Sequence, residues 1–285
     1  MLLAGALVLP ACGSSHSAPT AATTATTAAD TSSTKNDPTT SSTQAPSTAT
    51  ATSGAITATT PPPPPGPVVI GLGNSVPSGS ACSCQNFVSA YAAMVAAATK
   101  TRATVNNDAV AGSTSADVVN LLAKANVQAQ LKSATTVLIM TGANDYNDAF
   151  DQVSLGAPAA DTYSPVATAV QDNVTAVVEK IHGLNAAAHV VVLDYWAAME
   201  DGAVAAKDYD APAIAASVAC TTSVNQALAV AAKATGAMYL STYTAFKGPN
   251  GSIDPTALLA ADGDHPDAAG HQLIARTIYT ALPTG

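Results

Sequence analysis

Short apolar runs alternate with longer periodic stretches through most of the chain. Five runs have the length of β-strands and are rich in valine, isoleucine and leucine: 67–72, 102–106, 135–141, 189–195 and 237–242. They do not alternate strictly between polar and apolar positions, which is typical of strands buried on both faces. The pattern therefore predicts a sheet of parallel strands in the core.

Helical periodicity fills the gaps between these runs. The expected helices span 85–100, 115–131, 165–184, 211–236 and 266–282. Five consecutive strand–helix units favour an open parallel sheet with helices on both faces, a three-layer α/β/α sandwich. In such sheets ligands bind outside the carboxyl ends of the strands, so polar residues just after each strand are the candidates for function.

Composition divides the chain ahead of the first strand. Residues 13–66 are almost entirely Thr, Ser, Ala and Pro, with Asp30, Lys35 and Asp37 as the charged side chains and no aromatic residue. Such a segment buries too little apolar surface to offset the entropy cost of ordering. We expect a disordered tether there, followed over 67–285 by one domain with its own core.

The chain begins with an apolar run, MLLAGALVLPAC, that is too short to span a bilayer. Its length and composition fit the hydrophobic part of a secretory signal over residues 1–12. Leu9–Cys12 reads LPAC and resembles a bacterial lipobox, in which the cysteine is lipidated, although no Lys or Arg precedes the run. We therefore expect an extracytoplasmic protein of the cell envelope, secreted or held at the membrane through Cys12.

Three more cysteines follow in the domain: Cys82, Cys84 and Cys220. Because an exported protein folds in an oxidising compartment, we expect one disulfide and one leftover thiol. Cys220 is expected to pair with Cys82 or Cys84, and a bond between Cys82 and Cys84 is the alternative. Two cysteines spaced C-x-C, with no histidine nearby in the sequence, make a poor zinc motif, and we expect no metal site.

Charge and motif content exclude several classes of function. The formal net charge is −9 and no basic cluster appears, so we expect no nucleic-acid partner. The sequence contains no H-E-x-x-H zinc motif. Its only glutamates, Glu179 and Glu200, do not form the matched pair that glycoside cleavage requires.

The stretch GLGNSVPSG, residues 71–79, directly follows the first expected strand. It is not a dinucleotide-binding loop, because Val76 stands where a third glycine or an alanine is required. It is not a G-x-S-x-G nucleophile elbow either, because Gly73 and Pro77 flank Ser75. Ser75 is a candidate nucleophile only if other loops supply a base and donors for an oxyanion.

Later loops contain residues of those types. Asp262 and His265 lie three residues apart in DGDHPD, so the carboxylate can reach one ring nitrogen and leave the other for Ser75. Gly112 follows the second strand and has no side chain to keep its N–H from a ligand. Asn144 follows the third strand and can donate from its side-chain amide.

Four segments together resemble the conserved blocks of the SGNH/GDSL hydrolases: GNSV (73–76), AVAGSTSADV (109–118), TGANDYND (141–148) and DGDHPDAAGH (262–271). The resemblance extends from about residue 68 to 282. It implies the family's fold, in which the five-stranded parallel sheet is flavodoxin-like. Asn74 is a departure, because the family usually has Asp there.

The resemblance also implies roles for individual residues. Ser75 would be the nucleophile and the first oxyanion donor, through its backbone N–H, with Gly112 and Asn144 as the second and third donors. His265 would be the general base and then acid, oriented by Asp262.

Other residues near these blocks have competing interpretations. Asp264 is the alternative partner for the catalytic histidine. His271 is expected to be structural, and Tyr195 and Trp196 either line the substrate pocket or pack in the core.

These residues favour a serine esterase that forms an acyl-enzyme on small-molecule or envelope esters. We expect a monomer that requires no cofactor and contacts a membrane only through a lipid anchor. One alternative is acyl transfer to a hydroxyl at the same site. Another is a non-catalytic lipoprotein that holds an envelope glycan or lipid.

Overall fold

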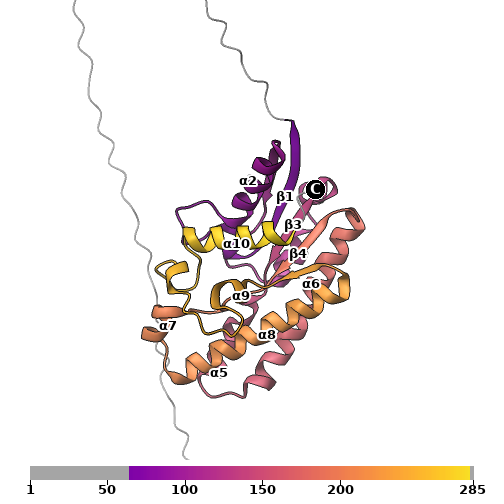
Figure 1. Ribbon diagram of the computed structural model, residues 1–285. Coiled ribbons are helices and arrows are strands. Elements are labelled where there is room, and N and C mark those ends of the chain that lie inside the picture. The colour runs from indigo at the N-terminus through magenta and orange to yellow at the C-terminus, as the bar shows by residue number, and fades with distance from the viewer. Residues whose placement is uncertain (1–63, 283–285) are drawn as a thin grey trace, which may run out of the picture. The chain divides into compact units, whose positions relative to one another are not determined.

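A computed structural model describes residues 64–282 of the chain (Figure 1). The predicted signal segment, Cys12 and the tether up to residue 63 lie outside the described residues. One sheet contains the strands β1 (Pro65–Gly73), β2 (Arg102–Asn107), β3 (Thr136–Met140), β4 (His189–Leu193) and β5 (Met238–Leu240). All its pairings are parallel and the order is β2-β1-β3-β4-β5. This is the strand order of flavodoxin-like sheets, as predicted.

Helices connect consecutive strands and close the chain. They are α1 (Ser75–Ser78), α2 (Phe87–Thr99), α3 (Ser115–Leu121), α4 (Ala125–Ser133), α5 (Asn147–Ser154), α6 (Ala159–Leu184), α7 (Gly202–Asp208), α8 (Ala211–Thr235), α9 (Thr242–Lys247) and α10 (Ala268–Ala281), with the short 3₁₀ turns η1 (Ala143–Tyr146) and η2 (Thr256–Leu258). Side-chain caps start several of them. Asn86, Asp210 and Asp267 accept backbone N–H groups at the beginnings of α2, α8 and α10.

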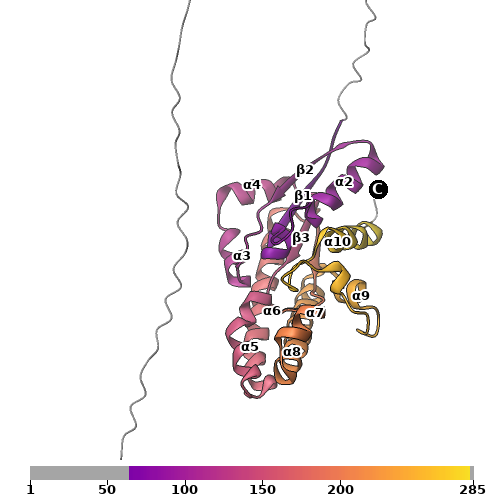
Figure 2. The ribbon, with the colours of Figure 1, turned by 90° about the vertical axis from the view of Figure 1, so that its left-hand side faces the viewer.

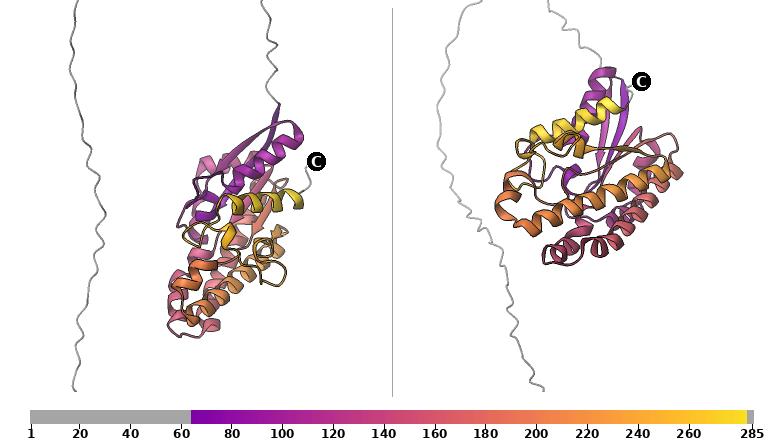
Figure 3. Two further views of the ribbon diagram at one scale, coloured as in Figure 1. Left: turned by 60° about the vertical axis from the view of Figure 1, so that its left-hand side comes forward. Right: turned by 60° about the horizontal axis from the view of Figure 1, so that its bottom comes forward.

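The helices form a layer on each face of the sheet. Helices α2 and α10 pack together on one face, and α3, α4 and α6 lie on the other (Figure 2). Helix α8 runs beside α6 and completes the second layer (Figure 3). The strands between them are buried on both sides, and Ile70, Leu138 and Val191 have no exposed surface. Burial on both faces explains why their sequences run apolar without alternation.

Three of the differences between the observed and the predicted elements are informative. Strand β1 begins at Pro65, inside the predicted tether, because the N–H of Arg102 donates to the carbonyl of Pro64 at 2.9 Å and extends the β1–β2 pairing. The predicted helix over 115–131 is two helices, since the chain turns between α3 and α4. Helix α6 begins at Ala159 and carries Pro165 inside it, so the proline is not the helix start that its position suggests.

The predicted bond to Cys220 is wrong. The structure joins Cys82 to Cys84 in the loop between α1 and α2. Cys220 is fully buried on α8 and carries a free thiol. Helix α8 covers the opposite face of the sheet from α2, and burial raises the pKa of the Cys220 thiol to about 12. The third cysteine is therefore a core residue.

Gly73, at the end of β1, is a position where the fold requires glycine. Its φ is +133°, and a Cβ there would overlap the backbone carbonyl of Met140 on β3. We expect Gly73→Ala to lower the free energy of unfolding by about 3 kcal/mol or more, through overpacking and backbone strain. Urea denaturation followed by circular dichroism measures this change.

Gly183, in the last turn of α6, is a matched control. It has ordinary helical φ and open space around its Cβ position. Gly183→Ala is expected to stabilise the protein by about 0.5–1 kcal/mol, because alanine has the higher helix propensity. Equal effects of the two substitutions would contradict the steric account of Gly73.

Candidate active site

Ser75 is the first residue of α1, directly after β1. Asn74 caps this short helix, and its side-chain oxygen accepts the N–H of Val76 at 3.3 Å. The Asn74 N–H donates to the carbonyl of Met140 at 3.1 Å. The carbonyl of Ser75 accepts the N–H of Gly79 at 3.1 Å and the hydroxyl of Ser78 at 2.7 Å. These bonds fix the backbone of Ser75 at the carboxyl end of the two central strands.

Asn74 is held by a residue from a distant loop. Its side-chain nitrogen donates to the hydroxyl oxygen of Tyr195, just after β4, at 2.9 Å. Both side chains are almost completely buried. The backbone of Tyr195 is fixed in turn by two hydrogen bonds with the side chain of Asn225 on α8. The amide at position 74 therefore anchors the turn of Ser75 to the other half of the sheet.

Gly112 and Asn144 lie in loops that are bonded to each other. Gly112 has a φ of +80° and open space around its Cβ position. The side-chain nitrogen of Asn144 donates to the carbonyl of Ser113 at 2.9 Å. The hydroxyl of Ser113 shares its proton between the carbonyls of Gly73 (3.0 Å) and Val110 (2.6 Å). Since an amide has two donor hydrogens, this bond to Ser113 leaves one hydrogen of Asn144 for a ligand.

Asp145 strengthens the same connection between loops. Its carboxylate accepts the backbone N–H of Ser115 at 2.9 Å and the hydroxyl of that residue at 2.6 Å. Burial raises the pKa of Asp145, although the bonds from Ser115 oppose this effect. Asp145 is thus a structural acceptor that joins the loop after β3 to the start of α3.

Asp262 and His265 form a compact pair in the loop before α10. The Asp262 carboxylate lies 2.8 Å from Nδ1 of the His265 ring and accepts the backbone N–H of His265 at 3.0 Å. It also accepts the N–H of Asp264 at 3.1 Å. Burial alone would raise the pKa of Asp262, but these hydrogen bonds outweigh it and lower the pKa below its usual value. The carboxylate therefore stays ionised beside the ring.

Asp264 is the poorer partner for the histidine. Its carboxylate lies 3.7 Å from Nδ1 of His265, which is beyond hydrogen-bond distance. The Asp262 contact is shorter by 0.9 Å, the difference between 3.7 and 2.8 Å. Asp262 is therefore the carboxylate within hydrogen-bond distance of the His265 ring.

The second ring nitrogen of His265 is buried and has no hydrogen-bond partner among residues 64–282. Accordingly, the structure contains no hydrogen bond between His265 and Ser75. Catalytic hydrogen bonds are often long without substrate and shorten when it binds. Nε2 of His265 is therefore a buried nitrogen that is free to accept a proton.

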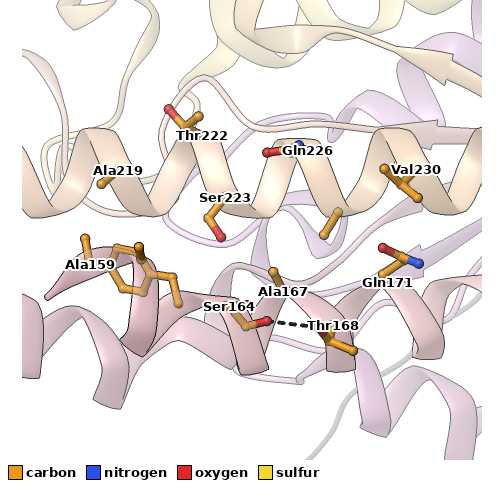
Figure 4. A pocket seen from close by; sticks show the side chains of 13 residues that line it. Ala159, Ser164, Ala167, Thr168, Gln171, Ala219, Thr222, Ser223, Gln226 and Val230 are labelled. Atoms are coloured by element: carbon orange, nitrogen blue, oxygen red, sulfur yellow. Dashed lines mark hydrogen bonds between the residues drawn. The ribbon is translucent and has the colours of Figure 1, made fainter.

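The larger cavities do not all lie at this site. One of about 490 Å³ is a groove between α6 and α8, lined by small and polar side chains such as Ser164, Thr168, Thr222 and Ser223 (Figure 4). Another, of about 440 Å³, is lined by Gly112 and by neighbours that include Gly73 and Lys124. The cavity beside Gly112 adjoins the loops after β1 and β2.

Tyr195 and Trp196 are both buried in the core. Trp196 is buried and stacks on Phe246 of α9, with ring centroids 4.3 Å apart. Tyr195 is the acceptor for Asn74 and was not identified from the sequence as its partner. Its position just after a buried strand was the only available signal, because the pairing joins residues 121 positions apart.

Comparisons with known proteins identify the family and the fold of the chain. The model of the GDSL-like Lipase/Acylhydrolase family matches residues 72–273. A search of curated protein sequences finds no significant match. Among solved structures, the lipase Lip_vut3 from a goat rumen metagenome is 17% identical and has a TM-score of 0.60, with 76% of this chain and 97% of that chain covered.

Two further structures share the fold. A variant of Axe2, an acetyl-xylooligosaccharide esterase from Geobacillus stearothermophilus, is 18% identical with a TM-score of 0.55, covering 78% of this chain and 97% of that one. An extracellular lipase from Streptomyces rimosus is 21% identical with a TM-score of 0.55, covering 76% of this chain and 100% of that one. At these identities the likeness shows a common fold.

The bond between Asn74 and Tyr195 predicts energetic coupling. In a double-mutant cycle of Asn74→Ala and Tyr195→Phe, we expect a coupling energy of about 0.5–3 kcal/mol, because each single change leaves a buried polar group without its partner. Chemical denaturation of the four proteins gives the coupling directly.

Tyr163 provides the control for this cycle. It is an equally buried tyrosine that donates to the carbonyl of Ala216 at 3.1 Å, away from Asn74. Tyr163→Phe and Asn74→Ala should add within about 0.5 kcal/mol. If the effects of Asn74→Ala and Tyr195→Phe on the free energy of unfolding also added, the bond between the two residues would not anchor the turn.

Proposed function

Because this chain belongs to the GDSL-like lipase/acylhydrolase family and is an ester-hydrolysing enzyme, we propose that it is a serine esterase with Ser75, His265 and Asp262 as its triad. The observation that carries the proposal is the His265 ring. One nitrogen is 2.8 Å from the Asp262 carboxylate, and the other is buried with no partner among the described residues. A ring oriented in this way supports the role of general base.

The first half of the proposed reaction acylates the enzyme. Nε2 of His265 takes the hydroxyl proton of Ser75 while Oγ attacks the ester carbonyl. The resulting tetrahedral oxyanion accepts hydrogen bonds from the backbone N–H groups of Ser75 and Gly112 and from the side chain of Asn144. The C–O bond of the ester then breaks, and His265 returns its proton to the leaving alcohol.

The second half releases the acid. Water gives a proton to Nε2 of His265 and attacks the acyl carbon bound to Ser75. A second oxyanion forms and collapses, the bond to Oγ breaks, and His265 returns the proton to Ser75. The ionised Asp262 stabilises the imidazolium in both halves, and its lowered pKa supports this role.

The fixed loops support the proposed oxyanion site. Asn144 and Gly112 come from loops after different strands, and the bond from Asn144 to the carbonyl of Ser113 holds the two loops together. Donors held in place before the reaction need no reorganisation as negative charge develops. The cavity of about 440 Å³ beside Gly112 offers room for a substrate group next to the reacting carbonyl.

We also propose that the enzyme acts outside the cytoplasm. The support is the apolar run before LPAC at the start of the chain and the Thr-, Ser-, Ala- and Pro-rich stretch that follows. Lipidation of Cys12 would hold the domain at the membrane by a long tether. Mass spectrometry of the mature N-terminus distinguishes an acylated Cys12 from an unmodified or differently cleaved chain.

A fluorophosphonate probe tests the nucleophile. We expect it to label the protein, and Ser75→Ala to abolish both labelling and hydrolysis of nitrophenyl esters, because the proposed acyl-enzyme forms on the hydroxyl that this substitution removes. Ser89→Ala on α2 is the matched control and should retain both. Hydrolysis that survives in Ser75→Ala at the wild-type rate would refute the assignment.

The two carboxylates of the 262–265 loop make a sharper test of the triad. Asp262→Asn should lower kcat by up to about 10⁴-fold, the effect of replacing the orienting carboxylate in a serine triad by an amide. Asp264→Asn should lower it by less than about tenfold, because a half-exposed ion pair contributes at most about 1 kcal/mol. Initial-rate kinetics on the two variants decides between them, and the reverse order of effects would move the orienting role to Asp264.

A further inference from the structure

Three potential metal ligands lie together outside the proposed active site. Cys82 and Cys84 belong to the loop between α1 and α2, and His271 lies on α10. A ring nitrogen of His271 and the two sulfur atoms are all within 4.8 Å of one another. The sequence showed no histidine near the C-x-C pair, but the fold brings one there from almost 190 residues away. In the structure the two sulfurs are joined as a disulfide.

His271 is an unusual residue for a protein core. Its side chain has no exposed surface, and Nε2 has no hydrogen-bond partner in the described part of the chain. Nδ1 accepts the backbone N–H of Phe87 at 3.3 Å, a long hydrogen bond. Buried polar atoms in native proteins almost always have partners, so the free nitrogen needs an explanation.

The ring is chemically suited to bind a cation. Burial lowers the pKa of His271 to about 4, against the opposing charge of Asp267, so the imidazole is neutral at physiological pH. A neutral imidazole has one nitrogen lone pair, which here accepts the Phe87 N–H and can bind a metal in its place. A metal bound to either ring nitrogen breaks the long hydrogen bond from Phe87. On Nδ1 the metal takes the lone pair that accepts this bond, and on Nε2 it leaves the ring proton on Nδ1.

The disulfide between Cys82 and Cys84 contributes little to the stability of the fold. A disulfide stabilises mainly by restricting the unfolded chain, and this effect grows with the number of residues that it encloses. The bond between Cys82 and Cys84 encloses only Ser83. Both cysteines are half-buried and the residues beside them, Ala81 and Ser83, are exposed, so a thiol reagent or a cation can reach the sulfurs.

We propose that Cys82, Cys84 and His271 bind one Zn²⁺ ion when the disulfide is reduced, and that the disulfide closes the site. A dithiol reductant supplies two electrons and two protons, the S–S bond breaks, and two thiols form while the reductant becomes a disulfide. Each thiol then loses its proton to solvent as its sulfur binds the metal.

The donor set and spacing fit this ion. Thiolate with imidazole selects Zn²⁺ over harder cations such as Mg²⁺ and Ca²⁺. Tetrahedral zinc has bonds of about 2.3 Å to sulfur and 2.0–2.1 Å to nitrogen, which places its ligand atoms about 3.5–3.8 Å apart. The three atoms already lie within 4.8 Å, so the exposed loop needs only a small adjustment. Water completes the fourth position, as in other three-ligand zinc sites.

Cobalt substitution tests the site on the full chain, carrying Cys12→Ser so that Cys82, Cys84 and Cys220 are the cysteines that remain. We expect the reduced protein to bind one equivalent of Co²⁺ with a thiolate-to-cobalt charge-transfer band in the near ultraviolet, and Zn²⁺ to displace it. The oxidised protein should show no band. A reduced protein without the band would overturn the proposal, whatever the esterase assays show.

Variants assign the ligands. Cys84→Ser should abolish the band, whereas Cys220→Ala, which removes a buried thiol on α8, should leave it unchanged. His271→Asn should weaken Zn²⁺ binding by more than about tenfold, since losing even an outer partner of a zinc ligand costs about 10–100-fold. A band that survives in Cys84→Ser or disappears in Cys220→Ala contradicts the site. The site is also contradicted if the His271→Asn protein is folded, as judged by circular dichroism, and binds Zn²⁺ as tightly as the parent protein.

Discussion

The close approach of β1 to β3 at Gly73 is the constraint on which the site depends. A side chain at Gly73 would overlap the carbonyl of Met140, so only glycine lets the ends of the two central strands meet there. The same carbonyl accepts the N–H of Asn74, which starts the turn of Ser75. The residue after β1 and the residues after β3 are therefore held side by side by backbone contacts, before any side chain takes part.

Hydrogen bonds then connect the neighbouring loops to this fixed point. Ser113 reaches the carbonyl of Gly73, Asn144 reaches the carbonyl of Ser113, and Asp145 holds Ser115. The loops after β1, β2 and β3 thus form one bonded unit. Asn74 extends it to the loop after β4 through Tyr195. An aspartate at position 74 would accept a hydrogen bond from the Tyr195 hydroxyl, whereas the amide of Asn74 donates one to it. The direction of the bond changes, but the connection between the two loops stays.

The strands were predictable because burial depends on local sequence, and so was the contact between Asp262 and His265, which lie within one turn. Buried parallel strands have a recognisable apolar pattern, and the residues after them must gather at one edge of the sheet. The break between α3 and α4 was not predictable, because apolar periodicity continues through it. The cysteine pairing and the position of His271 were missed for a different reason: they depend on which helices share a face. Cys220 on α8 and the loop before α2 lie on opposite sides of the sheet, while α10 returns beside α2.

The proposed base, His265, lies outside the bonded unit of loops that carries the proposed nucleophile, Ser75. Asp262 and His265 orient each other within a single turn, and the loop is tied to the rest of the domain by other bonds, such as that from the N–H of Asp201 to the carbonyl of Gly263 at 2.8 Å. The internal geometry of the pair is therefore independent of the position of Ser75. In the proposed reaction the unpartnered nitrogen of His265 meets the hydroxyl of Ser75. A bound ester that excludes water would favour this contact by strengthening the new hydrogen bond.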